Sequence, residues 1–335
     1  MRIRAYAIME TGGPAEPFEY DAVLGPQDVL VRITHRTIAR GDVQAIDNDW
    51  GDTRFPLVPS HEMLGVVERT GARVAHLRPG ARVGVGYQLG ACFECTYCTQ
   101  GTEQFCPRQT VVAVNAYGGL ADHVIVDGRF AFAIPSQIDS AASAPLFSSG
   151  VTVYAGIAHA NLPDHSRVGV LGVGGLGAMA LRFLVAMGHT ASGLSRSPEK
   201  REMVERLGGE FVDSSHLETL TERRATFDFI LSTLNVPFDL NACLRLLKPE
   251  GQLCLVASPL QPLSLSAGLL YDYGRRRIYG NYVGSRSDTM RMLELAATHR
   301  IQASVEVMPF SRANEAIDRM RRREVSGGLV LESGA

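Results

Sequence analysis

The chain has 335 residues, of which 45% are hydrophobic and 20% charged, and its formal net charge is −2. This composition predicts a globular protein long enough for two domains, and it excludes the strongly basic surface that nucleic acid or acidic lipid would select. The opening residues MRIRAYAIME lack the apolar core of a secretory signal, and glycines and Arg182 interrupt the most apolar stretch, residues 168–188. We therefore expect a cytoplasmic protein without a membrane span.

Residues 22 to about 135 predict a β-rich, barrel-like domain. Short runs such as DVLVRITH, GVVERTG and ADHVIVD are rich in β-branched residues and are separated by Gly, Pro and Asp. Inside this region the segment PLVPSHEMLGVV contains the pair His61-Glu62 between a proline-bounded turn and an apolar run. The pair has the composition of one corner of a metal site.

From about residue 150 strands alternate with helices. RVGVL, ASGLSR, FDFILSTL and GQLCLVAS are buried-strand patterns, and helical patterns such as PEKREMVERLG and FDLNACLRLL lie between them. This alternation predicts a parallel, doubly wound sheet and an α/β fold class. Near residue 288 the sequence becomes helical and basic, and it closes on a strand, GGLVLES.

Four of the six cysteines are clustered. Cys92, Cys95, Cys98 and Cys106 have the spacing C-x2-C-x2-C-x7-C, which lets one loop present four thiolates to a tetrahedral zinc ion. Such a site leaves no open coordination position, so we predict one structural zinc in a lobe of about residues 90–107 that stabilises the local fold.

A glycine fingerprint follows the strand RVGVL. Gly172, Gly174 and Gly177 form G-x-G-x-x-G at the start of a helical pattern, which is the context of a dinucleotide-binding turn. An NAD site would place an acidic residue at the end of the next strand, but Ser195 stands there, followed by Arg196 and Lys200. These groups favour a 2′-phosphate and therefore NADPH, unless they are ordinary exposed charges and the cofactor selectivity is loose.

The order of these segments, together with YGGLADHVIVD, APLFSSGVTVY, GVGGLG and NYVGS, resembles the zinc-type medium-chain dehydrogenase/reductase superfamily, and within it the cinnamyl-alcohol-dehydrogenase-like group. The resemblance covers nearly the whole chain. It implies a GroES-like catalytic domain (residues 1–147), a Rossmann NADP(H)-binding domain (148–287) and a return to the catalytic domain (288–335). It further implies an active site in the cleft between the domains and, commonly, a homodimer joined through the edges of the Rossmann sheets.

The sequence departs from this family at the catalytic zinc. Relatives that oxidise alcohols take the first ligand from the Cys of C-H-[ST]-D, where this chain has Ala39, Arg40, Gly41 and Asp42. The His of G-H-E is kept as His61, but Ser148 stands at the position of the third ligand, a cysteine. Because a catalytic zinc needs about three good protein ligands, we expect none here.

These losses predict the reaction class. The Ser or Thr that relays the alcohol proton in relatives is Gly41 here, so both the Lewis acid and the relay are missing. We expect an NADPH-dependent reductase that acts on an activated C=C or C=N bond of a small organic molecule, for which no alkoxide needs stabilising. The residues expected to serve the chemistry are His61, Glu62, Arg40, Asp42 and Ser148, with His61, Glu62 or Arg40 as the proton donor and Asp42 as a positioning residue.

The residues expected to contact the cofactor come from the fingerprint, from the ends of later strands and from the resemblance. They are Thr152, Gly172, Gly174, Gly175, Leu176, Gly177, Ser195, Arg196, Lys200, Thr233, Ser258, Gly284 and Ser285. Three alternatives stay open: an aldehyde reductase or alcohol dehydrogenase with an unconventional site, a non-redox step such as cyclisation in the same cleft, and a cofactor-binding protein without activity. The substrate itself is not specified by the sequence.

Overall fold

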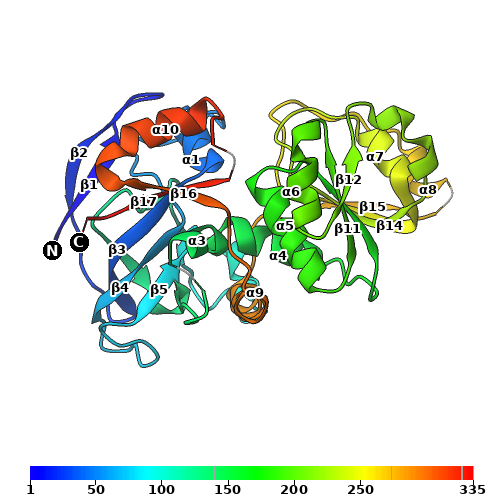
Figure 1. Cartoon of the computed structure of the whole chain (residues 1–335). Helices are drawn as coiled ribbons and strands as arrows, with labels where there is room; N and C mark the ends of the chain where they lie inside the picture. Colours follow the sequence, from blue (N-terminus) through cyan, green and yellow to red (C-terminus); the bar gives the residue numbers. More distant parts are fainter. Residues whose placement is uncertain (139, 273, 326, 335) are drawn as a thin grey trace. The chain divides into compact units, whose positions relative to one another are not determined.

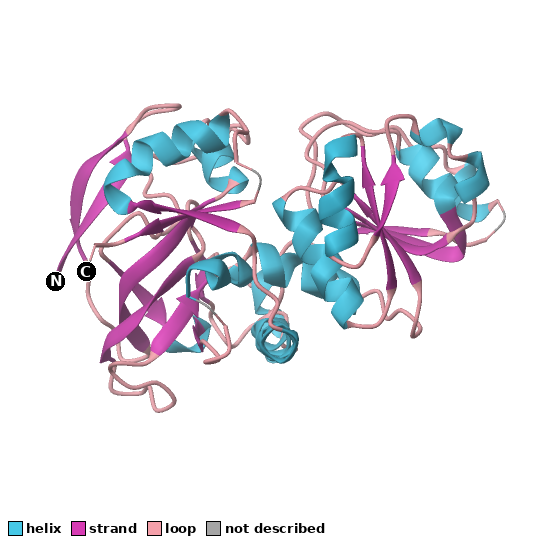
Figure 2. Ribbon diagram, in the orientation of Figure 1, coloured by secondary structure: helices cyan, strands magenta, loops and turns pink. Residues whose placement is uncertain are grey.

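The computed structural model describes residues 1–138, 140–272, 274–325 and 327–334, and the chain divides into two compact units (Figures 1 and 2). Unit 1 comprises Met1–Ser148 and Ser285–Ala335, and unit 2 comprises Ser149–Gly284. The boundaries lie one and three residues from those expected at 147/148 and 287/288. Ser285 belongs to unit 1 because it caps the first helix of the returning segment: its hydroxyl accepts from Asp288 N at 3.1 Å.

Unit 1 is built on a seven-stranded, mostly antiparallel sheet. Its strand order is β16-β17-β3-β4-β5-β9, with β8 also paired to β3. Alternate residues of β3, including Val29, Val31 and Ile33, are buried on one face against Val83 and Val85, as a strand with one covered face requires. The strands are β3 (Asp28–Ile38), β4 (Met63–Thr70), β5 (Arg82–Val85), β8 (His123–Asp127), β9 (Ala131–Ala133), β16 (Val305–Pro309) and β17 (Gly328–Glu332).

Smaller elements surround this sheet. A second apolar core joins the β1-β2 pair and two helices to the other face, with Ile8, Ile38 and Ile317 among its buried members. The elements are β1 (Arg2–Ile8), β2 (Ala15–Asp21), α1 (Arg40–Ile46), β6 (Gln88–Gly90), α2 (Thr96–Thr99), β7 (Thr110–Val111), α3 (Ser140–Ser143), α9 (Arg286–His299) and α10 (Ala313–Arg321).

Unit 2 is a six-stranded parallel sheet in the order β12-β11-β10-β13-β14-β15, with helices on both faces (Figure 2). The sequence order reverses between β10 and β13, which is where doubly wound sheets bind ligands at the carboxyl ends of their strands. The strands are β10 (Arg167–Leu171), β11 (Thr190–Ser195), β12 (Glu210–Asp213), β13 (Phe227–Ser232), β14 (Leu247–Leu255) and β15 (Arg277–Gly280), and the helices are α4 (Ser149–Ala158), α5 (Gly175–Ala186), α6 (Arg201–Arg206), α7 (Leu240–Leu246) and α8 (Gly268–Tyr271). The predicted α/β fold class, with a β-rich domain and a doubly wound parallel sheet, is confirmed.

Among the described helices, none is by itself long and apolar enough to cross a membrane. One bent pair, Ala141–Phe147 with Ser149–Ala158, meets the length and composition test, but most residues of α4 are buried inside the protein.

Candidate functional site

Asp42 holds His61 in one orientation. Asp42 lies in the first turn of α1 and is 1% exposed, and its Oδ1 accepts from His61 Nδ1 at 2.8 Å and from the Ser60 backbone N–H at 2.8 Å. Its other oxygen accepts from Ala39 N at 2.8 Å and closes the start of the helix. The imidazole therefore uses Nδ1 for this bond, and Nε2 remains as its second polar atom.

The charge state of His61 follows from these neighbours. Burial acts to lower the pKa of His61, but the charge and hydrogen bond of Asp42, helped by the charge of Glu62, outweigh it and raise the pKa to about 9. His61 is consequently an imidazolium at neutral pH, with an Nε2–H that can donate.

Glu62 is buried and hydrogen-bonded to strand β3. Its side chain is buried, and Oε2 accepts from the Thr37 hydroxyl at 2.5 Å. The structure thus joins two of the expected residues, Asp42 and His61, by a hydrogen bond, and it joins Glu62 to Thr37, which the sequence did not indicate.

The ring of His61 borders Gly41 and Tyr87. A Cβ atom added to Gly41 would lie 3.4 Å from His61 Cε1 and 3.9 Å from Nε2, so a hydroxyl-bearing side chain at this position would reach the ring. The Tyr87 ring meets the imidazole edge to face at 6.5 Å. Arg40 begins α1, and its buried Nε has no hydrogen-bond partner among the described residues.

Ser148 approaches this region from the end of the first segment of unit 1. Phe147 lies against the end of β5, because a Cβ atom added to Gly86 would lie 2.1 Å from the Phe147 carbonyl oxygen. Ser148 is therefore next to β5, whose partner strand, β4, begins directly after Glu62. Ser148 is 8% exposed, and no hydrogen bond joins it to His61 in the part of the chain that the structure describes.

Two of the three positions at which the resemblance places catalytic zinc ligands carry neither a thiolate nor an imidazole. Ala39 offers no side-chain donor, and Ser148 offers a neutral hydroxyl in place of a thiolate. Across the described ranges, the group of three or more His, Cys, Asp or Glu side chains close enough to hold one ion is the cysteine cluster of the lobe. Of the three positions that the resemblance implies, that of His61 has a side chain that commonly binds zinc.

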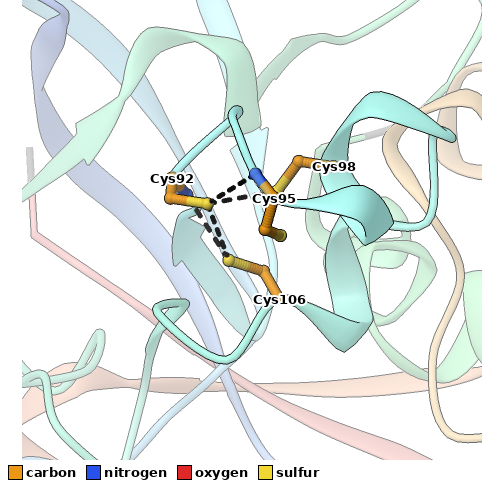
Figure 3. Close-up of side chains that lie close together, drawn as sticks. All are labelled: Cys92, Cys95, Cys98 and Cys106. Atoms are coloured by element: carbon orange, nitrogen blue, oxygen red, sulfur yellow. Dashed lines mark hydrogen bonds between the residues drawn. The ribbon is translucent and has the colours of Figure 1, made fainter.

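The four cysteines of the lobe fit a zinc ion (Figure 3). Their ligand atoms lie within 4.8 Å of one another, with Cys92 Sγ 3.5 Å from Cys106 Sγ and 3.8 Å from Cys98 Sγ. A tetrahedron with Zn–S bonds of about 2.3 Å has sulfur atoms about 3.8 Å apart. Backbone N–H groups, first that of Glu94, lower the pKa of Cys92 to about 6, whereas burial raises that of Cys98 to about 12. Because a bound metal requires deprotonated thiols, its charge would offset the effect of burial on the pKa of Cys98.

Arg286 connects the lobe to helix α9. Its Nη1 lies 3.3 Å from Glu103 Oε1 in the lobe, and its Nε donates to the Arg129 carbonyl oxygen at 2.9 Å. Its guanidinium also lies 5.4 Å from the centre of the Phe93 ring, within the range of a cation–π contact. The lobe is therefore held by side-chain contacts as well as by its own loop.

The glycine fingerprint has the geometry of a phosphate-binding turn. Gly172 has φ +89°, and a Cβ added to Gly177 would lie 2.1 Å from the Gly172 carbonyl oxygen, so both positions require glycine. A Cβ at Gly174 would meet nothing within 4 Å, which leaves room for a ligand at the start of α5, where Gly175 and Leu176 follow. The turn therefore fits a pyrophosphate.

The residues expected at the 2′-phosphate lie beside this turn. Ser195 ends β11, and its hydroxyl accepts from Ser197 N at 3.2 Å, while Arg196 is exposed. Lys200 reaches the fingerprint itself, because its Nζ donates to the Val173 carbonyl oxygen at 2.6 Å. The arrangement offers a hydroxyl and two cations at the end of β11, and an acidic side chain, Asp213, lies on the neighbouring strand as the sheet partner of Ser195.

The other expected cofactor residues have different surroundings. Thr233 supports the fingerprint, because its hydroxyl donates to the Gly172 carbonyl oxygen at 2.8 Å. Thr152 is buried and donates to the Tyr282 carbonyl oxygen at 3.4 Å, whereas Ser258 is exposed. The Ser285 hydroxyl is engaged in capping α9, and Gly284 precedes it at the unit boundary.

Two features of the site were not anticipated from the sequence. Thr37 is a polar residue in a β-rich pattern and carries no local signal. Ser60 has φ +80°, is fully buried, and has a hydroxyl without a partner among the described residues. The signal for Ser60 was available, because it occupies the glycine position of G-H-E.

Comparisons with known proteins support the family that the sequence resembles. Residues 25–136 match the family model of the alcohol dehydrogenase GroES-like domain, and residues 175–298 match that of zinc-binding dehydrogenases. An aldehyde reductase of Synechocystis is 34% identical over 331 residues, which cover 98% of each chain.

Solved structures agree over the whole length. A cinnamyl alcohol dehydrogenase of Sorghum bicolor has a TM-score of 0.93 and 33% identity, and the match covers 99% of this chain and 98% of that one. The structure of CAD from Helicobacter pylori complexed with NADP(H) has a TM-score of 0.91 and 25% identity, and the match covers 99% of this chain and 98% of that one. The resemblance seen in the sequence is confirmed: the chain is an oxidoreductase and belongs to the zinc-type medium-chain dehydrogenase/reductase superfamily, in its cinnamyl-alcohol-dehydrogenase-like group.

Proposed function

We propose that the protein is an NADPH-dependent reductase that transfers hydride to an activated C=C or C=N bond of a small organic molecule and uses no catalytic zinc. The observation that carries this proposal is the donor set: Ala39 and Ser148 stand at two of the three ligand positions, and only His61 is retained. The cysteine lobe would hold one structural zinc per chain.

The chemistry follows from what the donor set lacks. Reduction of a simple carbonyl builds an alkoxide, and a metal ion supplies several kcal/mol of stabilisation to that charge. An iminium carbon is already cationic, and an activated alkene disperses the new charge over a conjugated system. Both acceptors therefore depend less on a metal.

Within this class the cluster favours a conjugated carbonyl compound. Hydride from NADPH would form the new C–H bond at the β carbon while the π electrons move to the carbonyl oxygen. The His61 Nε2–H would then donate its proton to the resulting enolate, which gives the saturated carbonyl compound and NADP⁺. Asp42 maintains the orientation of the imidazole and stabilises its charged form. A cationic iminium would gain less from an imidazolium and more from the carboxylates of Asp42 and Glu62.

The cofactor proposal rests on unit 2. Ser195, Arg196 and Lys200 lie at the end of β11 and beside the glycine fingerprint, where they favour a 2′-phosphate over a free ribose diol. The solved relative that contains NADP(H) is consistent with this choice.

Aldehyde reduction is the second candidate. It is favoured by the activities for which the relatives are named, and by a protonated His61 that could donate to a carbonyl oxygen without a metal. In this case the product is an alcohol, and the C=C bond of a conjugated substrate stays intact.

Metal analysis and product analysis test the proposal together. We expect one zinc per chain and NADPH oxidation with an enone or a cyclic iminium, while cinnamaldehyde, if reduced, yields the saturated aldehyde. The variant A39C/S148C restores the thiolate donors and should raise the zinc count to two, and A39S/S148A provides the matched control without thiols. Two zinc ions in the wild-type protein, together with rapid conversion of cinnamaldehyde to the alcohol, would refute the proposal.

We also propose that the protein forms a homodimer. Within the described residues, β15 pairs with β14 on one side only, so its outer edge can accept a second copy. Light scattering during size-exclusion chromatography should give twice the 36.3 kDa of the chain, and a monomer mass at micromolar concentration would contradict the proposal.

A further inference from the structure

Arg36 is a fully buried cation on β3, with 0% of its surface exposed. Its guanidinium donates to backbone carbonyl oxygens: Nε to that of Gly119 at 3.0 Å, and Nη2 to that of Ala121 at 3.1 Å. The Phe310 ring covers it, at 4.2 Å from Cζ to the ring centre. All its hydrogen bonds within the described residues go to uncharged oxygens. Because a cation buried without an anion is costly, these bonds must offset the loss of water.

The segment that Arg36 contacts, residues 118–121, holds the loop that precedes His61. Three consecutive N–H groups of this segment donate to the three carbonyl oxygens of residues 58–60. The bonds are Gly118 N to Val58 O at 2.8 Å, Gly119 N to Ser60 O at 2.7 Å and Leu120 N to Pro59 O at 3.0 Å. A Cβ atom added to Gly118 would lie 2.5 Å from the Ser60 carbonyl oxygen, so the two backbones are in close contact. A shift of the segment would therefore shift the loop.

This loop carries one partner of the Asp42–His61 hydrogen bond, and β3 leads to the other. The Ser60 N–H donates to Asp42 Oδ1 at 2.8 Å, and the same oxygen accepts from His61 Nδ1 at 2.8 Å. Asp42 lies in the first turn of α1, which begins two residues after the end of β3. Arg36 thus connects the strand that leads to Asp42 with the segment that holds the loop of His61.

We propose that Arg36 is a positioning residue whose guanidinium fixes residues 118–121, and through them the loop that places His61 against Asp42. Its consequence for the reaction rests on the function proposed above. The unusual burial of an unpaired cation is explained by this connection, because one planar fork of donors can bind several carbonyl oxygens at once.

Two substitutions of Arg36 and one of Ser333 test this role. Arg36→Met keeps an unbranched side chain and removes every donor, whereas Arg36→Lys keeps the charge and a single ammonium donor. A displacement of about 1 Å can cost about a hundredfold in rate, so we expect R36M to lower kcat for an enone at least about tenfold. The KM for NADPH should stay within about twofold, because the glycine fingerprint lies in unit 2. R36K should lose less than R36M.

Ser333→Ala is the matched control. It removes the bond between Arg36 Nη2 and Ser333 Oγ, 2.9 Å long, and leaves the bonds to Gly119 and Ala121 in place. S333A should lower the urea midpoint and keep kcat within about twofold of the wild type. If S333A and R36M lower kcat equally, or if R36M keeps kcat within about twofold, the positioning role is overturned.

A measurement without substrate separates this proposal from the proposed function. Hydrogen exchange followed by mass spectrometry on the full chain should be at least about fivefold faster in R36M for peptides containing residues 58–61 and 118–121. Peptides of β10 and β11, and all of these peptides in S333A, should be unchanged. If no compound of the panel is reduced, this acceleration still supports the role of Arg36, and only the proposed function fails.

Unchanged exchange at residues 58–61 in R36M would overturn the proposal whatever the activity. If R36M does not fold, R36K takes its place in both measurements. R36K should then show a smaller loss of kcat and a smaller acceleration of exchange, and an R36K protein that equals the wild type in both would contradict the role of the guanidinium.

Discussion

Replacing Ser60 with glycine should stabilise unit 1. Ser60 has φ +80°, and holding a non-glycine residue there costs about 1 kcal/mol or more. Its fully buried hydroxyl lacks a partner among the described residues, which adds about 1 kcal/mol or more. The greater conformational freedom of glycine in the unfolded chain offsets about 0.5–1 kcal/mol of this gain. The expected net gain for S60G is about 1–2 kcal/mol.

The assay can assign this gain to its two causes. The backbone N–H of Ser60 still donates to Asp42 in every variant, so the His61 cluster keeps this contact. Urea unfolding followed by the fluorescence of Trp50, the single tryptophan, reports on the same unit, and S60G should raise the midpoint by about 0.5 M. Ser60→Ala removes only the hydroxyl and should give about half of the gain. An S60G protein that is no more stable than the wild type would refute both the strain and the unsatisfied hydroxyl.

Three further predictions concern charge, metal and cofactor. Since folding raises the pKa of His61 from 6.5 to about 9, its charge adds stability that is complete below pH 6.5 and is lost as the pH rises through 9. The free energy of unfolding falls by at most about 3 kcal/mol over this pH range. Urea midpoints measured across the range should show the fall in the wild type and not in H61Q. Removal of zinc by a chelator, or Cys98→Ser, should lower the melting temperature by several degrees while NADPH binding, measured by fluorescence, persists. Ser195→Asp should raise the KM for NADPH at least about tenfold relative to NADH, and an unchanged ratio would show that Ser195 is not at the 2′-phosphate.

The sequence predicted unit 2 well because its signals are local. The four predicted strands, β10, β11, β13 and β14, contain short apolar runs, and Gly177 is needed for its close approach to Gly172, five residues earlier. The four cysteines were equally predictable, since one short loop supplies all four thiols.

The details of the candidate site depended on long-range pairing. Thr37 meets Glu62 because of the register of β3 and β4, and two irregularities in that ladder, at Leu30/Val31 and Ile33/His35, shift the register along the way. A one-residue change would turn Thr37 to the other face of the sheet. Such a contact cannot be read from the local pattern of either strand.

Strand β17 has a consequence for how the protein is made. It lies between β16 and β3, where Leu329 pairs with Ile38, and Ser333 supplies one acceptor to the fully buried guanidinium of Arg36. All of unit 2 is translated between these partners. On the ribosome, unit 2 can therefore complete its sheet while residues 35–38 of β3 still lack their β17 partner, next to Arg36, which lacks the hydrogen bond to Ser333. Until β17 is made, this short edge can pair with a strand of another chain.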